Sequence, residues 1–271
     1  MKWAIKLELY RAFHNKGYWA ALSIPLMISL YQFIFWVLPA SKSIAPMDNL
    51  DYPCSVFNHA LMLELTGPSS TIYYYVVILV AAIPMGSSYY TDLREGYIKN
   101  LYVRMERKHY LSAKYLAVFI SAGSIFVIPL LLNLLLTSMV MPAIIPQYGG
   151  SFAIIGNTML KELFYTHPWG YVIVYLIIDF VMAGLLACMA LSVTKFIYNK
   201  YIVMFSPFLF CLILQIVAQL SYYNAAAPLA IIDAQQSVWM NMPTVIIEIS
   251  LLFLVSFSSY MIGGGKNRDT L

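Results

Sequence analysis

Apolar side chains along the chain gather in six stretches of about twenty or more residues, and polar and charged residues collect between them. A helix needs roughly 20 apolar residues to cross about 30 Å of hydrocarbon. Backbone groups in lipid must bond within their own segment, which favours helices over any open sheet. The pattern predicts an all-α membrane protein with one transmembrane domain over 1–271. The predicted spans are 18–38, 72–90, 114–142, 169–194, 201–222 and 243–262.

Composition supports this class and excludes several others. Apolar residues make up 61% of the 271 positions and charged residues only 10%, whereas an average soluble domain carries roughly 25% charge. A soluble enzyme, a secreted domain and a disordered protein are therefore excluded. The net charge of +4 comes without the aromatic and basic surface of a nucleic-acid binder, so we expect membrane lipid and no nucleic acid as a partner.

The basic residues predict how the chain is threaded. Four precede the first span, six lie between the second and third, two separate the fourth from the fifth, and two follow the sixth. These account for all but two of the 16 Lys and Arg residues, and the exceptions are Lys42 and Lys161. The positive-inside rule makes the basic side cytoplasmic. Both termini are thus expected inside a cell membrane that the chain crosses six times.

The segment before the first span, 2–16, mixes aromatic and basic residues. This mixture predicts an interfacial amphipathic helix, with aromatic rings at the headgroups and basic side chains reaching water. A simple basic flank is the alternative. A cleaved signal peptide is disfavoured, since the apolar run is long and sixteen polar-rich residues precede it.

The three loops on the outer side contain no recognisable catalytic or metal-binding pattern. In the first, Asp48, Asp51, His59 and Glu64 have irregular spacing, so we expect solvated charges rather than a metal site. The second contains a stretch, 157–165, that fits a short helix on the outer leaflet. The third, 223–242, is apolar at 225–232 and fits a re-entrant loop. Three cysteines without CxxC spacing indicate neither a disulfide framework nor a zinc site.

The cytoplasmic segment 92–113 is the most informative one. It is rich in basic residues, a Glu95-Gly96 turn divides it, and its apolar residues suit a helix along the membrane surface. Its pattern is an acidic residue, Gly, an apolar Leu, Arg-x-x-Tyr-Leu and a Lys that opens the third span. The matching residues are Glu95, Gly96, Leu101, Arg107, Tyr110, Leu111 and Lys114.

In this pattern and in its layout of spans, the chain resembles the ABC-2 type permeases, the membrane subunits of type V ATP-binding-cassette exporters. A Pro frequent before the Arg in that family is replaced here by Met105 and Glu106. The resemblance implies two permease subunits, identical or related, and two cytosolic ATPases that bind ATP and Mg²⁺. It also implies an ATPase-coupling region that includes Glu95, Gly96, Leu101, Tyr102, Arg104, Arg107 and Tyr110.

This chain has no ATPase site of its own in its sequence. The phosphate-cradling pattern GxxxxGK[ST] is missing, since Gly263-Gly-Gly-Lys266 is followed by Asn267 and lacks the leading Gly. We therefore expect no catalytic residue and no bound cofactor in this chain, with energy supplied by a separate polypeptide.

Polar residues inside the predicted spans are candidates for a substrate pathway, because placing a polar group in hydrocarbon has an unfavourable free energy. Asp179 lies near the middle of the fourth span, Gln32 lies in the first, and Gln215 and Gln219 share a face of the fifth. Each of them could instead form a hydrogen bond to a neighbouring helix that stabilises helix packing. Glu248 lies close enough to a span end to reach water.

Two function classes follow. One is an export permease that moves an amphiphilic substrate, such as a peptide, a drug or a lipid-like compound; no domain for solute capture is visible, which favours export. The other is a secondary transporter or intramembrane enzyme centred on Asp179, although neither a paired-carboxylate constellation nor an inverted repeat is evident. A membrane scaffold or sensor is a third, less specific reading.

Overall fold

The computed structural model describes residues 2–42, 55–63, 68–103, 105–146, 159–194, 196–197, 199–221, 227–234 and 240–266. Within these ranges the chain is helical and contains no strand. Its elements in order are α1 (Lys2–Phe13), α2 (Lys16–Gln32), η1 (Phe33–Val37), α3 (Leu38–Lys42), α4 (Val56–His59), η2 (Ala60–Met62), α5 (Ser69–Ala81), α6 (Ser88–Arg94), α7 (Tyr97–Tyr102), α8 (Arg107–Val140), α9 (Lys161–Thr166), α10 (Pro168–Val193), α11 (Lys200–Leu220), α12 (Pro228–Ile232) and α13 (Met242–Lys266).

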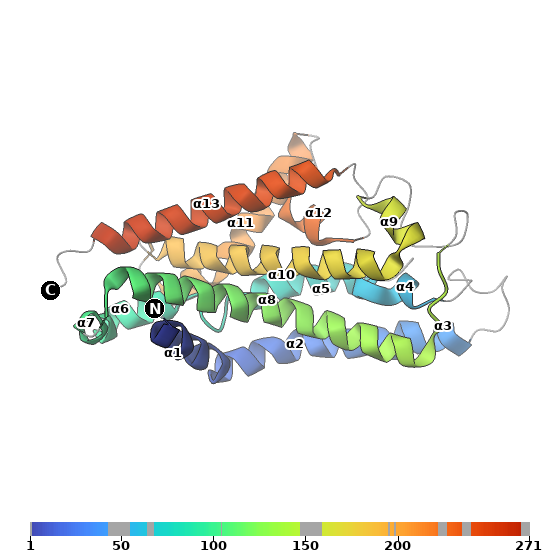
Figure 1. The fold of residues 1–271 in the computed structure, drawn as a ribbon, viewed down its shortest axis with the longest axis horizontal. Helices are drawn as coiled ribbons and strands as arrows, with labels where there is room; N and C mark the ends of the chain where they lie inside the picture. The colour runs from blue at the N-terminus through green and yellow to red at the C-terminus, as the bar shows by residue number, and fades with distance from the viewer. Residues whose placement is uncertain are drawn as a thin grey trace.

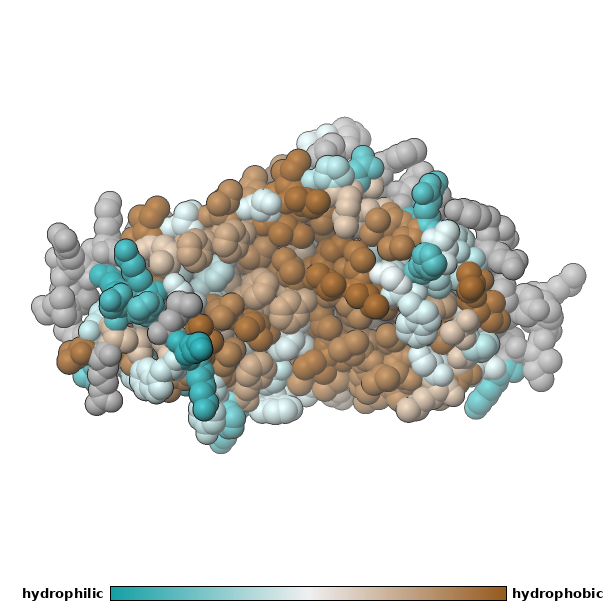
Figure 2. Space-filling view, viewed as in Figure 1, coloured by the Kyte–Doolittle hydropathy of each residue, from teal (hydrophilic) through white to brown (hydrophobic). Residues whose placement is uncertain are grey.

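Five helices in the described ranges are long and apolar enough to cross a membrane. They are Lys16–Lys42, Arg107–Val140, Pro168–Val193, Lys200–Leu220 and Met242–Ile262. Each contains or closely matches one of the predicted spans, so the all-α membrane architecture agrees with the sequence pattern. Figure 2 shows the corresponding surface, with an apolar band between hydrophilic ends.

The second predicted span, 72–90, is wrong as a single helix. α5 ends at Ala81, the chain turns through 82–87, and α6 resumes at Ser88. Pro84 accounts for the break, because proline has no backbone N–H and its ring clashes with the preceding turn. The carbonyl oxygen of Pro84 instead accepts a hydrogen bond of 2.8 Å from the Asn15 side chain.

Proline does not break the other spans. Pro25, Pro129 and Pro207 lie within α2, α8 and α11. Beside Pro84 the chain lies close to α10, since a Cβ on Gly86 would lie 3.2 Å from the Cβ of Ala190. The irregular segment 82–87 therefore approaches α10 closely.

The elements divide between the two ends of an elongated bundle. α1, α6, α7 and the carboxyl end of α13 lie at one end, whereas α3, α4 and α9 lie at the other (Figure 1). α8 and α10 run antiparallel through the middle, and α10 packs mainly on α8 and α13. The cores of both halves contain residues of α8 and α10.

α8 and α10 approach closely through a reciprocal pair of glycines and phenylalanines. The ring of Phe119 in α8 covers Gly184 of α10, and the ring of Phe180 in α10 covers Gly123 of α8. The two rings meet edge to face with their centroids 5.6 Å apart. In each helix Phe and Gly are four residues apart and so share a face. The missing Cβ atoms leave the space that the opposite rings fill.

One expectation about the loops is wrong, and a second is confirmed in part. His59 in α4 is buried rather than solvated. The short helix expected within 157–165 is present as α9, and Phe164 within it and Met159 before it pack into the main apolar core. α12, which lies in the predicted re-entrant loop, is buried against α5, α10 and α11. Asp48, Asp51, Cys54 and Glu64 lie outside the described residues.

We predict that Gly184→Ala destabilises the bundle by about 1–3 kcal/mol, the usual range for overpacking a core. The added Cβ would lie 2.5 Å from a ring carbon of Phe119 and 2.8 Å from its carbonyl oxygen. Thermal unfolding of the purified protein measures the effect. Gly170→Ala is the matched control on the same helix, since its nearest neighbour would be 3.6 Å away. Equal transitions for the two variants would contradict this packing.

Candidate functional site

A buried cluster of charges joins three elements at the α1 end of the bundle. The guanidinium of Arg11 in α1 binds Asp92 of α6 through two hydrogen bonds, of 2.7 and 3.1 Å. Arg11 also donates to Glu8, one turn earlier, at 2.8 Å. Lys114 of α8 donates to the same Asp92 carboxylate and lies 3.5 Å from Glu8. Tyr110 completes the cluster by donating to Asp92 at 2.7 Å.

The cluster is almost fully removed from solvent. Glu8, Asp92 and Lys114 are each at most 2% exposed, and the Arg11 side chain is 31% exposed. Two acidic and two basic groups balance one another. Each of these side chains can stay ionised and buried only beside its partners, because an unpaired buried charge is strongly unfavourable. The balance explains how Glu8, Asp92 and Lys114 can be buried here beside the partly exposed Arg11.

The partners decide the charge state of Asp92. Burial alone would raise the pKa of its carboxyl, but the hydrogen bond from Arg11 and the positive charge of Lys114 oppose this effect. The net result is a pKa below the ordinary aspartate value, so Asp92 is ionised at neutral pH.

Helix periodicity brings these residues together. Glu8 and Arg11 are three residues apart on α1, and Tyr110 and Lys114 are four apart on α8, so each pair shares one face. Asp92 reaches the same point because α6 resumes after the break at Pro84. The cluster therefore ties the first helix of the chain to both helices that flank α7.

α7 follows directly, in the region expected to couple to an ATPase. The predicted turn is confirmed: Gly96 has a φ of +72° and precedes α7, a conformation that favours glycine. The Arg11 guanidinium lies 4.6 Å from the ring centroid of Tyr97. Leu101 points inward and is buried in the core of this end, while Glu95 is exposed.

The chain bends between α7 and α8 at Met105 and Glu106, without a proline. Glu106 has φ −63° and ψ 137°, the extended conformation that proline itself adopts. Arg107 then begins α8 with its guanidinium 5.4 Å from the ring centroid of Tyr102, and Tyr102 meets Tyr110 edge to face. Arg104 lies outside the described residues.

A surface groove of about 660 Å³ separates α1 from α7. Its lining residues are Trp3, Leu7, Tyr97, Asn100, Leu101 and Val103. Trp3 is 58% exposed and Val103 is 88% exposed. Large exposed apolar side chains at a polar end of the molecule are typical of a protein or membrane contact.

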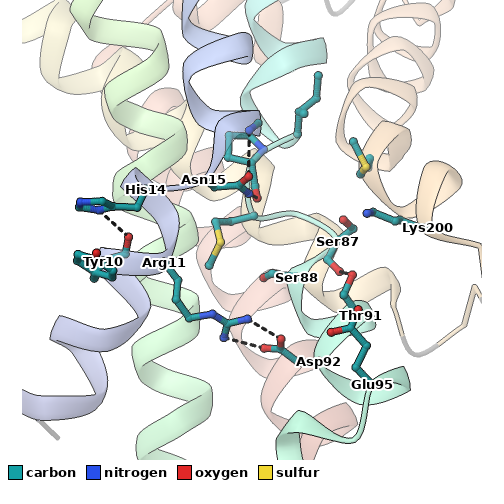
Figure 3. A pocket seen from close by; sticks show the side chains of 15 residues that line it. Tyr10, Arg11, His14, Asn15, Ser87, Ser88, Thr91, Asp92, Glu95 and Lys200 are labelled. Carbon is teal, nitrogen blue, oxygen red and sulfur yellow. Dashed lines mark hydrogen bonds and ion pairs between the residues drawn. The ribbon is translucent and has the colours of Figure 1, made fainter.

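A second pocket, of about 560 Å³, lies beside the ion cluster, between α1, α2, the 83–88 segment, α6 and α11. Figure 3 shows Arg11 and Asp92 joined in its wall, with His14, Asn15 and Glu95 around it and Lys200 at the start of α11. Charged groups of both signs line it. The pocket can receive a polar or charged part of a molecule.

Gln32 lies in a buried polar contact at the other end of the bundle. Its amide accepts a 2.6 Å hydrogen bond from Asn133 of α8 and donates one of 3.1 Å to the carbonyl of Leu63. It therefore holds the 55–63 segment in place. In that segment Leu61 and Met62 both have a φ of 59°, which is strained for such residues.

The other proposed pathway residues are not brought together with Gln32. Asp179 is completely buried in α10, and neither of its carboxyl oxygens has a hydrogen-bond partner among the described residues. The phenol groups of Tyr73, Tyr74 and Tyr175 lie within electrostatic range of it. On α11, Gln215 is half-buried and Gln219 is exposed. Hydrogen bonds join none of these four residues to another within the described ranges.

No protein-family model matches the chain, and no curated protein and no solved structure is significantly similar to it. Sequence reasoning missed the pairing of Glu8, Arg11, Asp92 and Lys114, because it treated the basic residues only as topology signals. The available signal was two acidic residues placed among these basic residues, close to spans.

We predict that Asp92→Asn lowers the free energy of unfolding by about 3–5 kcal/mol, the range for breaking a buried ion pair from one side. The substitution leaves Lys114 and Arg11 without their shared carboxylate. Chemical or thermal unfolding of the purified protein measures the effect. Glu95→Gln is the matched control, because its carboxylate is exposed nearby and we expect a change within about 0.5 kcal/mol.

The lowered pKa of Asp92 also predicts a pH dependence. A depressed folded-state pKa contributes stability above the unfolded-state value, about 3.9, and this contribution is lost as pH falls through the folded-state value. The stability difference between wild type and Asp92→Asn should be constant from about pH 8 to 5 and shrink below about pH 4. Loss of the difference already between pH 7 and 5 would contradict the proposed charge state.

Proposed function

We propose that this chain is the permease subunit of an ATP-driven exporter in the cell membrane, powered by a separate cytosolic ATPase. Support comes from the ion cluster of Arg11, Asp92 and Lys114, which fastens α1 to both helices flanking α7. The proposed complex contains two permease subunits, identical or related, and two ATPases that bind ATP and Mg²⁺. The resemblance in segment 92–113 and the sequence-predicted orientation favour this assembly.

Coupling would work through the rigidity of the α1 end. α7 is connected to α6 by the Gly96 turn and to α8 by the bend at Glu106. Because Asp92 and Lys114 are bonded to each other and to α1, a push on α7 is expected to move α6 and α8 together. Movement of an ATPase pair would thus be transmitted from α7 to the spans, because α6, α7 and α8 are held together.

The docking surface would be the groove between α1 and α7. Its exposed residues Trp3 and Val103 offer an apolar contact. Outside the groove, the exposed Glu95 before α7 and the half-buried Arg107 after it offer polar contacts. Leu101 and Tyr110 would support this surface without touching the ATPase, because both are buried in this chain. Within the coupling region this divides contact residues from residues that support them.

The substrate would enter through the pocket beside the ion cluster. It lies between α2, the broken second span and α11, and it combines charged groups with apolar residues such as Met85 and Met204. This mixture suits an amphiphilic substrate. Six crossings require the segment 69–90, from α5 to the start of α6, to span the membrane despite its break, with Asp92 on the cytoplasmic side. At about 1.5 Å per residue this segment is long enough.

A secondary transporter centred on Asp179 is the second candidate, and one observation favours it. The buried carboxyl of Asp179 has no hydrogen-bond partner within the described residues and no basic residue paired with it. Intramembrane carboxyl groups of this kind serve proton relays in pumps and transporters. In that case proton flow, and not ATP, would drive transport.

The coupling proposal predicts that Val103→Glu combined with Arg107→Gln weakens ATPase binding at least tenfold while membrane insertion stays normal. The variant places a charge on the exposed apolar contact and removes a charged donor, whose bond is worth about 1.5–3 kcal/mol. Co-purification of the ATPase and substrate-stimulated ATP hydrolysis measure the effect. The double variant Arg104→Gln/Arg107→Gln tests the charges alone.

Lys266→Gln/Arg268→Gln is the control for that experiment, because it removes two basic charges from the carboxyl end and leaves the groove intact. We expect it to bind and stimulate the ATPase normally. Normal binding and hydrolysis by the groove variant would remove α7 from the coupling role. ATP turnover by the purified chain without a second protein would contradict the separate energy source.

Asp179→Asn and Asp179→Leu separate the two candidate functions. Under the ATP-driven proposal, Asp179→Asn retains transport, since an amide keeps the polarity without a proton to release, and Asp179→Leu loses part of the activity. Under the proton-driven alternative, both variants abolish transport. Uptake or efflux by reconstituted vesicles, with and without a proton gradient, distinguishes these outcomes.

A further inference from the structure

An apolar groove of about 410 Å³ lies on the side of the bundle, between α1, α8, α10 and α13. It is lined by Ile5, Ser112, Tyr115, Leu116, Phe119, Val181, Leu185, Ile249, Phe253 and Phe257. The volume falls within the range of roughly 300–1,000 Å³ that is typical of ligand sites. It is separate from the polar pocket and from the groove between α1 and α7, with which it shares no residue.

The groove offers its occupant no free polar group. Its two hydroxyl groups are already bonded, since Ser112 donates to the Lys108 carbonyl at 2.9 Å and the Tyr115 hydroxyl lies 2.7 Å from that of Ser256. The remaining lining side chains are hydrocarbon. A sugar, nucleotide or peptide backbone would lose its hydration here and gain no hydrogen bond. The chemistry therefore selects a hydrocarbon chain.

Positive charge lies at the α1 end of the groove. Lys108 is one turn before Ser112 on the same face of α8, and Lys2 is one turn before Ile5 on α1. Both lysines are exposed, and neither forms an ion pair with another described residue. A hydrocarbon slot with cations at its polar end matches a lipid that carries a negative headgroup.

We propose that this groove binds one acyl chain of an anionic phospholipid from the leaflet next to α1, with Lys2 and Lys108 at its headgroup. The lipid contacts both α1 and the spans, because Ile5 of α1 lines the groove together with residues of α8, α10 and α13. The bound lipid thus contacts α1, the helix that the ion cluster also fastens to α6 and α8. The proposal requires only that the chain lies in a membrane and is independent of what it transports.

Native mass spectrometry of the delipidated protein tests lipid selectivity. Phosphatidylglycerol and phosphatidylcholine with identical acyl chains are titrated separately. We expect one phosphatidylglycerol per chain to bind at least fivefold more tightly, the effect of about one lysine near an anionic surface. Lys108→Gln should remove about fivefold of this affinity, whereas Lys16→Gln, an exposed lysine on α2, should not. Equal affinity for the two lipids would overturn the proposal.

Groove-filling variants test the place of binding. Ile249→Trp puts extra volume into the groove, and Ile247→Trp puts the same ring on the exposed, opposite side of α13. We expect Ile249→Trp to reduce phosphatidylglycerol binding at least tenfold and Ile247→Trp to leave it unchanged. Size-exclusion profiles and thermal transitions check that both variants fold. Equal lipid binding by the two variants would overturn the proposal.

A third measurement needs no variant. Phosphatidylglycerol with a photoreactive diazirine in its acyl chain should label the groove segments 112–119 and 249–257 more strongly than the exposed apolar face of α11. Even labelling of α11 and the groove would indicate only a general lipid shell. A lipid-free dimer that shields the groove would indicate a second copy as occupant. Either result overturns the proposal.

Discussion

The α1 end of the structure depends on one buried carboxylate, that of Asp92. It accepts hydrogen bonds from Arg11, Tyr110 and Lys114, which come from two helices far apart in the sequence. None of these charged groups could remain buried alone, because an uncompensated ion in this environment costs several kcal/mol. Each therefore requires the others. This mutual requirement fixes α1 against α6 and α8 in a way that apolar packing, which is not directional, would not.

This constraint places the features at that end of the molecule. The pocket of Figure 3 has the Arg11–Asp92 pair in its wall, and the groove between α1 and α7 exists because α1 is held beside α7. The apolar groove also uses α1, through Ile5. A loss of the ion cluster would alter all three cavities together. The proposed entry of substrate, docking of an ATPase and binding of a lipid thus share one structural support.

The sequence predicted the positions of the long helices well, since apolar runs are unambiguous when they exceed the thickness of a membrane. It also predicted the turn at Gly96. It did not predict the break at Pro84, because Pro25, Pro129 and Pro207 look the same locally and stay within helices. The inward packing of His59 and Phe164 was missed for a similar reason. Burial of a loop depends on contacts with distant elements, which periodicity does not report.

The candidate site was less predictable than the fold. In the sequence, Arg11 and Lys114 indicate only the orientation of the chain, and the structure shows that both bind Asp92. A double-mutant cycle on Arg11→Gln and Asp92→Asn, followed by chemical unfolding, tests the central interaction most directly. We predict a coupling free energy of about 1.5–3 kcal/mol, against about zero for the cycle of Arg11→Gln with Glu95→Gln. Additive effects of Arg11→Gln and Asp92→Asn would contradict the account.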